Sequence, residues 1–258
     1  MRIVITGGTS GIGETTAVYL LKKGHTVYSI SRRAGNISGI NYLKADVMDR
    51  ASLELAFNQI ANDGGIDVLI NNVGIGISGA FEFHQFEHID QIIDVNLKGV
   101  INASKLCLPH LRKSKGKLIN VGSVAGELAI PFQSIYSALK SAVHNFTFSL
   151  SNELKPTGVK VCCVMPGDTK TKFTKNRIKN CDDGLYSQRA KRSVEKMEKD
   201  EQKGAQPIKV AKVIEKCIKK KNPPLKVAVG FGYKFLLFLS RLLPHKLVNY
   251  VLYGIYAK

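Results

Sequence analysis

Short apolar runs alternate along the chain with longer stretches in which apolar residues recur at helical spacing. The runs predict strands at 2–6, 26–30, 40–45, 67–71, 116–122, 159–165 and 225–230, and the stretches between them predict helices at 12–23, 50–62, 87–113, 134–155 and 208–221. Because residues 68–70 and 159–164 are almost continuously apolar, we expect strands buried on both faces. The alternation predicts one α/β domain over 1–258, a doubly wound parallel sheet with helices on both faces.

Two segments depart from this alternation. Residues 169–207 are polar and poor in core residues, and we interpret them as a long excursion from the sheet and a candidate mobile lid. Residues 233–258 are apolar, and Pro244 divides them into two helices too short to span a bilayer. They either pack over the domain or a second subunit, or rest on an anionic membrane. In the second case Lys234, Arg241, His245 and Lys246 flank the apolar residues.

The chain has a formal net charge of +18, and residues 169–221 hold 17 Lys or Arg against 7 Asp or Glu. Such an excess attracts anionic partners, but interleaved acids and scarce aromatic residues argue against nucleic acid and favour a solvated surface. The cysteines are odd in number and show no metal-ligand spacing, and the histidines at 84, 88 and 110 are scattered. With a strand expected from residue 2, we expect no targeting leader, no metal and a reduced cytoplasmic protein. The cysteines are Cys107, Cys162, Cys163, Cys181 and Cys217.

A glycine-rich turn follows the first predicted strand and precedes the first predicted helix. Glycines let the backbone turn sharply there, and the first N–H groups of the helix then point at the ligand with the positive end of the helix dipole. The turn therefore predicts a pyrophosphate site, although such a turn also serves as a plain helix cap. Its residues are Thr6, Gly7, Gly8, Thr9, Ser10, Gly11, Ile12 and Gly13.

The residues after the second strand predict which dinucleotide binds. Ser31, Arg32 and Arg33 stand where a fold that prefers NAD usually places an acid. Guanidinium groups suit bidentate contact with a 2′-phosphate, so the position favours NADP, the alternative being a surface arginine pair.

Ser123 follows the fifth predicted strand, and Tyr136 and Lys140 come later, one turn apart on a predicted helix. A tyrosine is a poor acid or base at neutral pH, but a neighbouring ammonium and an oxidised nicotinamide should lower its pKa. Tyr136 could then exchange a proton with a substrate oxygen that Ser123 holds. The same spacing recurs at Tyr19 and Lys23, which lie far down the first helix and are expected to have no catalytic role.

Together these elements resemble the short-chain dehydrogenase/reductase family over nearly all of residues 2–230. The resemblance implies a Rossmann-type fold and a catalytic tetrad of Asn96, Ser123, Tyr136 and Lys140, in which Asn96 interrupts its helix and binds a water that links Lys140 to solvent. It also implies that Thr169, where the family usually has Val or Ile, belongs to a loop that holds the nicotinamide. The implied cofactor-binding residues are Gly7, Thr9, Ser10, Gly11, Ile12, Gly13, Ser31, Arg32, Arg33, Asp46, Val47, Asn72, Gly74, Tyr136, Lys140, Pro166, Gly167, Thr169 and Thr171.

From these observations we expect an NADP(H)-dependent oxidoreductase acting on a carbonyl or secondary alcohol of an apolar, lipid- or steroid-like substrate. In the resemblance, Asp46 contacts the adenine, and Lys140 binds the ribose. The alternative is an NADP-binding regulatory or interaction protein without turnover. We also expect a homo-oligomer, a dimer or tetramer, in the cytoplasm or at a membrane surface.

Overall fold

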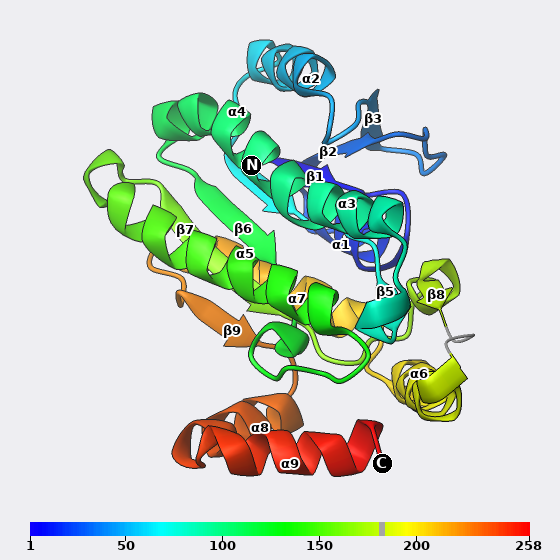
Figure 1. Ribbon diagram of the computed structural model, residues 1–258. Helices are drawn as coiled ribbons and strands as arrows, with labels where there is room; N and C mark the ends of the chain where they lie inside the picture. Colours follow the sequence, from blue (N-terminus) through cyan, green and yellow to red (C-terminus); the bar gives the residue numbers. More distant parts are fainter. Residues whose placement is uncertain (181–183) are drawn as a thin grey trace.

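The computed structural model describes residues 1–180 and 184–258. Within these residues a seven-stranded parallel sheet forms the centre of the molecule, with helices on both faces (Figure 1). Its order, β3-β2-β1-β4-β6-β7-β9, reverses direction between β1 and β4, and ligands of such sheets bind at this point beyond the carboxyl ends of the strands. The strands are β1 (Arg2–Thr6), β2 (Thr26–Ser31), β3 (Ile40–Lys44), β4 (Val68–Asn71), β6 (Lys117–Val121), β7 (Lys160–Met165) and β9 (Lys226–Ala228).

Both faces of the sheet are buried because successive strand residues are apolar. In β1, Val4 packs into one core cluster, whereas Ile3 and Ile5 pack into another on the opposite face. Helices α2 (Arg50–Asn62), α4 (Gly99–Ser114) and α5 (Ser134–Glu153) cover the first face, and α1 (Gly11–Leu21) and α7 (Pro207–Lys219) cover the second. The predicted doubly wound α/β fold is confirmed.

The helix expected over 87–113 has an interruption. It consists of α3 (Phe86–Ile93), a π-helical turn (Asp94–Lys98) and α4. A π turn accommodates one extra residue and is often found at functional sites. Asn96 lies within it and is completely buried, so this polar side chain must find partners inside the protein.

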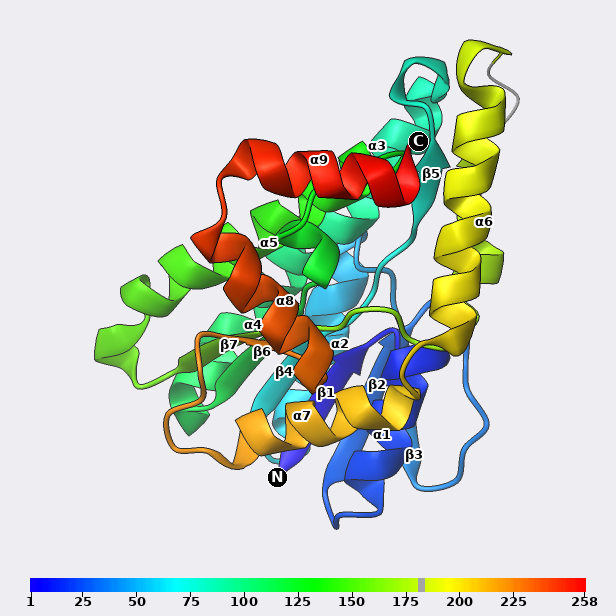
Figure 2. The ribbon, with the colours of Figure 1, turned by 90° about the horizontal axis from the view of Figure 1, so that it is seen from below.

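The polar segment 169–207 contains more regular structure than its sequence predicts. Strand β8 (Ile178–Asn180) pairs in parallel with β5 (Ile77–Gly79), and α6 (Ser187–Lys203) stands beside β5 (Figure 2). No helix is predicted here from the sequence, because the segment is strongly polar. Helix α6 is instead stabilised by tertiary packing, through a narrow stripe of buried side chains along one side of the helix. Its members are Ala190, Ser193, Val194 and Met197.

The carboxyl-terminal segment forms α8 (Phe231–Leu242) and α9 (His245–Tyr256), with Pro244 between them, which confirms the two short helices predicted. Leu237 of α8 and Leu252 of α9 join a small core with Val124, Leu128 and Met165. The last helix, α9, lies near α6 and contacts it (Figure 2). No helix of the described part of the chain is long and apolar enough to cross a membrane.

Candidate active site

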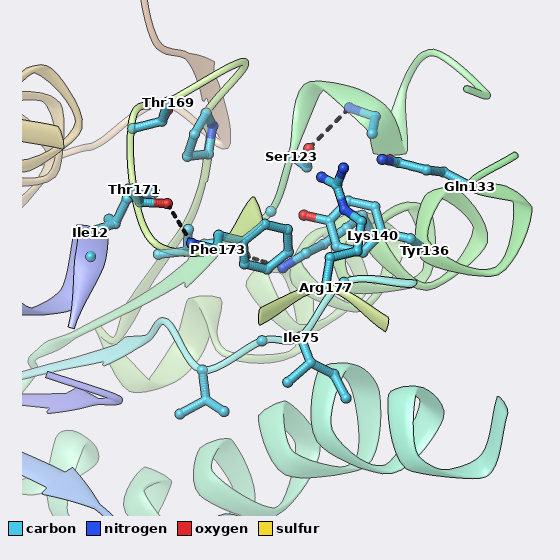
Figure 3. Close-up of a pocket in the computed structure, with 18 of the residues that line it drawn as sticks. Ile12, Ile75, Ser123, Gln133, Tyr136, Lys140, Thr169, Thr171, Phe173 and Arg177 are labelled. Carbon is cyan, nitrogen blue, oxygen red and sulfur yellow. Dashed lines mark hydrogen bonds between the residues drawn. The ribbon is translucent and has the colours of Figure 1, made fainter. Parts of the chain in front are cut away.

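A cavity of about 1270 Å³ opens beyond the carboxyl ends of the parallel strands. One end is walled by the β1–α1 turn and the residues after β2 and β3, and the other by side chains of α6, α8 and α9. Figure 3 shows Tyr136, Lys140 and Ser123 in this cavity, close to Phe173 and Arg177. Every residue predicted for catalysis or cofactor binding lines this cavity except Gly13 and Asn96.

The β1–α1 turn forms a cradle that only glycine can build. Gly7 has a φ of +73°, and its N–H donates to Ile30 at 2.8 Å. A Cβ on Gly13 would lie 2.3 Å from the Gly7 oxygen, so glycine at 13 lets α1 pack directly on the turn. Asn72 Nδ2 donates to the backbone oxygens of Thr6 and Gly7, at 3.2 Å each, and these bonds stabilise the turn. A backbone shaped in this way, at the start of a helix, fits a pyrophosphate.

The residues after β2 and β3 form the wall next to this cradle. Arg32 and Arg33 are exposed and line the cavity. Asp46 also lines it, and its Oδ1 accepts the Met48 N–H at 3.0 Å. Two exposed guanidinium groups therefore lie at the position where this fold binds the adenosine ribose.

The loop after β7 lies over the glycine turn. A Cβ on Gly11 would be 3.5 Å from Thr171, which places these two segments in direct contact. Thr169 Oγ1 donates to the Gly167 oxygen at 2.9 Å, and Thr171 Oγ1 accepts the Phe173 N–H at 3.1 Å. These local bonds hold the loop in shape at the cavity wall, between the cradle and Tyr136 (Figure 3).

Ser123, Tyr136 and Lys140 meet at the centre of the cavity. Lys140 is 5% exposed, its Nζ donates to the Val121 oxygen at 3.0 Å, and Nζ lies 5.8 Å from the centroid of the Tyr136 ring. Ser123 follows β6, and its Oγ accepts the Ala125 N–H at 3.1 Å. The sequence pattern therefore brings an ammonium, a phenol and a hydroxyl together in one place.

The electrostatics differ from the sequence expectation at Tyr136. Burial raises the pKa of Tyr136 to about 12, against the opposing effects of a hydrogen bond with Ser123 and the charge of Arg177. Burial lowers the pKa of Lys140 to about 8. Desolvation thus outweighs the lowering of the Tyr136 pKa that was expected from nearby positive charge. Tyr136 is a fully protonated phenol at neutral pH.

Asn96 supports the site from behind instead of lining it. Its Oδ1 accepts the Ile75 N–H and its Nδ2 donates to the Ile75 oxygen, both at 2.8 Å. A Cβ placed on Gly74 would be 3.4 Å from Asn96 Oδ1 and 3.7 Å from Lys140 Nζ. Asn96 therefore clamps the backbone next to Lys140, and the water relay implied for it stays a prediction.

A buried histidine that the sequence analysis did not single out lies behind Ser123. His144 Nε2 accepts the Ser123 N–H at 3.4 Å, and its Nδ1 lies 3.2 Å from Glu127 Oε1. The hydrogen bond with His144, and then the one with Lys226, lowers the pKa of Glu127 to about 2. The available signal was the position of His144, one helical turn beyond Lys140 on the same helix.

Two further polar residues reach the cavity from the segment 169–207. Arg177 and Glu201 form an ion pair beside Phe173, and all three line the cavity. The sequence offered no signal for them, because they lie 24 residues apart in a segment with many charges.

The structure also bears on the metal and thiol expectations. Within residues 1–180 and 184–258 no group of three or more His, Cys, Asp or Glu is arranged to hold a metal ion. Cys107, Cys162, Cys163 and Cys217 are free and buried, and Cys181 lies outside the described residues. Burial raises the pKa of the Cys107 thiol, which makes it unreactive.

Comparisons with known proteins agree with this geometry. The family model of the short chain dehydrogenases matches residues 1–182. A 3-ketodihydrosphingosine reductase of Bacteroides thetaiotaomicron is 40% identical over 262 residues, which cover 99% of this chain and 97% of that protein. An uncharacterized oxidoreductase of Bacillus subtilis is 31% identical over 261 residues and 93% of each chain. The crystal structure of a short-chain dehydrogenase from Streptomyces avermitilis has a TM-score of 0.82 at 25% identity, over 93% of this chain and 92% of that one. The chain therefore belongs to the short-chain dehydrogenase/reductase family of oxidoreductases, nicotinamide-dependent enzymes that act on CH–OH and C=O groups.

Proposed function

We propose that this chain is an NADP(H)-dependent reductase of long-chain keto lipids of the 3-ketodihydrosphingosine type. The observation that carries the proposal is a cavity with a dinucleotide cradle at one end, Tyr136 in the middle and apolar helices at the other end. The 40% identical Bacteroides relative, named for reduction of 3-ketodihydrosphingosine, supports the same substrate class.

In this proposal Tyr136 donates its proton to the substrate oxygen, and Ser123 holds that oxygen by a hydrogen bond. A bound nicotinamide supplies the hydride for the carbonyl carbon. Lys140 binds the ribose and provides positive charge near the phenol, which stabilises the phenolate left after proton transfer. His144 holds the backbone N–H of Ser123, and Asn96 holds the backbone beside Lys140.

The chain's own residues would hold the rest of the cofactor. The backbone of 9–12 would bind the pyrophosphate, Asp46 the adenine, and the loop 166–171 the nicotinamide. Arg32 and Arg33 would bind a 2′-phosphate, and because no acid follows β2, the ribose hydroxyls of NAD would lack an acceptor there. We therefore propose a preference for NADP(H) over NAD(H).

The apolar end of the cavity fits an alkyl chain. It is lined by side chains from one side of α8 and from α9, with no charged group among those the two helices supply. An alkyl chain gains roughly 0.8 kcal/mol for each CH₂ that leaves water, so even a few buried CH₂ groups favour long ketones strongly. The lining side chains include Leu236 and Leu239 of α8, Leu243 directly after α8, and Val251 and Ile255 of α9.

The other side of α8 is exposed and equally apolar, and we propose that it rests on an anionic membrane. Phe235, Phe238 and Leu242 are 59%, 60% and 65% exposed and do not line the cavity. Residues 231–258 contain four Lys or Arg and no acid, which complements anionic headgroups. A lipid substrate would then enter the cavity from the membrane that holds it.

Enzyme kinetics test the substrate proposal. Oxidation of NADPH and of NADH is followed with long-chain 3-ketodihydrosphingosine and with a short, polar ketone. We expect turnover with NADPH and a kcat/KM at least about 100-fold higher for the long ketone. A preference for the short ketone, or an absence of turnover, would refute it.

Liposome sedimentation tests the membrane proposal. Anionic vesicles should carry the wild type down, and Phe238→Glu combined with Leu242→Glu should reduce binding at least about 10-fold. Leu55→Glu on α2, where Leu55 is 71% exposed, is the matched control and should bind as the wild type does. A protein that ignores vesicles and forms a dimer through α8 would assign this face to a second subunit instead.

A further inference from the structure

The ion pair between Arg177 and Glu201 is unusually deeply buried for a segment rich in exposed charges. The side chain of Arg177 is 2% exposed and that of Glu201 14% exposed. Arg177 precedes β8, Glu201 lies in the last turn of α6, and the guanidinium carbon lies 5.8 Å from the centroid of the Phe173 ring. The pair therefore joins two elements at the wall of the cavity.

The guanidinium of Arg177 has donors that this pair does not use. Nη2 contacts Glu201, whereas Nε and Nη1 are buried and have no hydrogen-bond partner in the protein. Buried donors left unpaired are costly, so their presence indicates a ligand that completes them. Figure 3 shows Arg177 beside Tyr136 and Phe173 in the cavity, and the charge of Arg177 acts on Tyr136. The free donors thus lie next to the proposed reacting carbonyl.

The neighbourhood of Arg177 carries charges of both signs, and Lys140 and Lys172 also line the cavity. Glu201 pairs with Arg177, and Lys196 pairs with Asp200 at 2.9 Å. Asp168 is a third carboxylate, and it accepts a hydrogen bond from a neutral phenol, that of Tyr233. The charges of Asp168, Asp200 and Glu201 all contribute to raising the pKa of the Tyr256 hydroxyl, after the larger effect of burial. A cationic group placed next to the Glu201 carboxylate would be attracted to it.

We propose, on the basis of the ketone reductase function above, that Arg177 and Glu201 form a subsite for an amino-alcohol head group adjoining the carbonyl. The free N–H groups of Arg177 donate to the hydroxyl oxygen, and the Glu201 carboxylate accepts from the ammonium. The alkyl chain extends the other way, along α8 and α9. Together these contacts place the ketone at Tyr136 and select a 2-amino-1-hydroxy-3-ketone over a plain ketone of the same length.

Kinetics and calorimetry with matched ligands test the subsite. The substrates are a long-chain 2-amino-1-hydroxy-3-ketone and its analogue that lacks the amino group, and binding of the amino diol product is measured by calorimetry. A hydrogen bond to a charged group corresponds to roughly a 10- to 100-fold change in affinity. We expect the wild type to prefer the amino ketone by this factor, and Glu201→Gln to remove the preference through KM with kcat retained.

Two further variants guard against a folding defect. Arg177→Met combined with Glu201→Gln leaves no unpaired buried charge, and it should keep NADPH affinity and thermal stability yet lose the preference. Glu198→Gln breaks the neighbouring ion pair between Lys179 and Glu198, which joins the same two elements. This control variant should leave kcat/KM unchanged for both ketones.

The outcomes separate the two proposals. Equal kcat/KM for both ketones in the wild type, or a preference for a ketone with an acidic head group, overturns the subsite and leaves the reductase standing. Absence of turnover with every long ketone overturns the reductase. In that case tight, Glu201-dependent binding of the amino diol would still support the subsite, and its absence would overturn it.

Discussion

Tyr136→Phe removes one oxygen atom from the centre of the cavity and leaves the ring in place. The ring should keep its contacts with Phe173, at 5.9 Å between centroids, and with Lys140. Only the hydrogen bond with Ser123 and the proton are lost. The substitution therefore tests the acid separately from the architecture.

The magnitude follows from what the phenol supplies. Because burial holds the pKa of Tyr136 at about 12, the group carries its proton throughout the neutral range and is available as the acid for ketone reduction. General acid catalysis of this kind contributes about 10²- to 10⁴-fold, or about 3–5 kcal/mol of transition-state stabilisation. The lost hydrogen bond costs about 1 kcal/mol, which removal of a buried polar oxygen largely offsets. Thermal stability should thus change little.

Single-turnover reduction of the long-chain ketone, followed by the disappearance of NADPH, measures the chemical step. We expect the rate to fall at least about 100-fold while the Kd for NADPH stays within about 3-fold of the wild-type value. Tyr19→Phe is the matched control, because Tyr19 donates to Glu215 on α7, away from the cavity, in the same Tyr-x-x-x-Lys spacing. If the Tyr136→Phe protein kept about a fifth or more of the wild-type rate, the acid would have to be another group.

Three other predictions concern the cofactor, the pH dependence and the clamp behind the site. Arg32→Asp should weaken NADPH binding about 10- to 100-fold and leave NADH unchanged or tighter, measured by equilibrium titration; equal affinity of the wild type for both would contradict the cofactor assignment. Burial lowers the pKa of Lys140 to about 8, so its charge is present below that pH and lost above it. The affinity for NADPH should therefore fall as pH rises through about 8. An affinity that stays constant up to about pH 9.5 would exclude a contact between NADPH and the Lys140 ammonium. Asn96→Ala removes both 2.8 Å hydrogen bonds with Ile75 and should lower the free energy of unfolding by about 2–4 kcal/mol in denaturant titrations; a loss below about 1 kcal/mol would show that the clamp carries little stability.

The high pKa of Tyr136 has a consequence for direction. A neutral phenol is ready to donate, whereas oxidation of an alcohol needs the phenolate as base. The charges that could stabilise a phenolate are those of Arg177 and of the Lys140 ammonium, 5.8 Å from the ring centroid, and that of a bound cofactor. Tyr136 in the chain alone is therefore in the protonation state that reduction of a ketone requires.

The fold and the central chemistry could be predicted from sequence because their signals are local. Continuous apolar runs identify strands buried on both faces, and the glycines from Gly7 to Gly13 identify a turn whose backbone geometry other residues cannot adopt. Tyr136 and Lys140 are one helical turn apart, so their proximity follows from helix geometry alone. Ser123 was placed by the rule that chemistry gathers at the carboxyl ends of parallel strands.

The substrate end of the cavity was decided by tertiary structure. Helix α6 has a strongly polar sequence and is stabilised because Ala190, Val194 and Met197 are buried against the rest of the fold. Arg177 and Glu201 meet only because β8 pairs with β5 and α6 packs beside it, a contact between segments distant in sequence. The pKa of Tyr136 was also decided by the tertiary structure. Residue spacing predicted an ammonium nearby, but the pKa is raised by burial, which comes from the whole surrounding protein. Local geometry can be read from a sequence, whereas burial and long-range pairing exist only once the chain has folded.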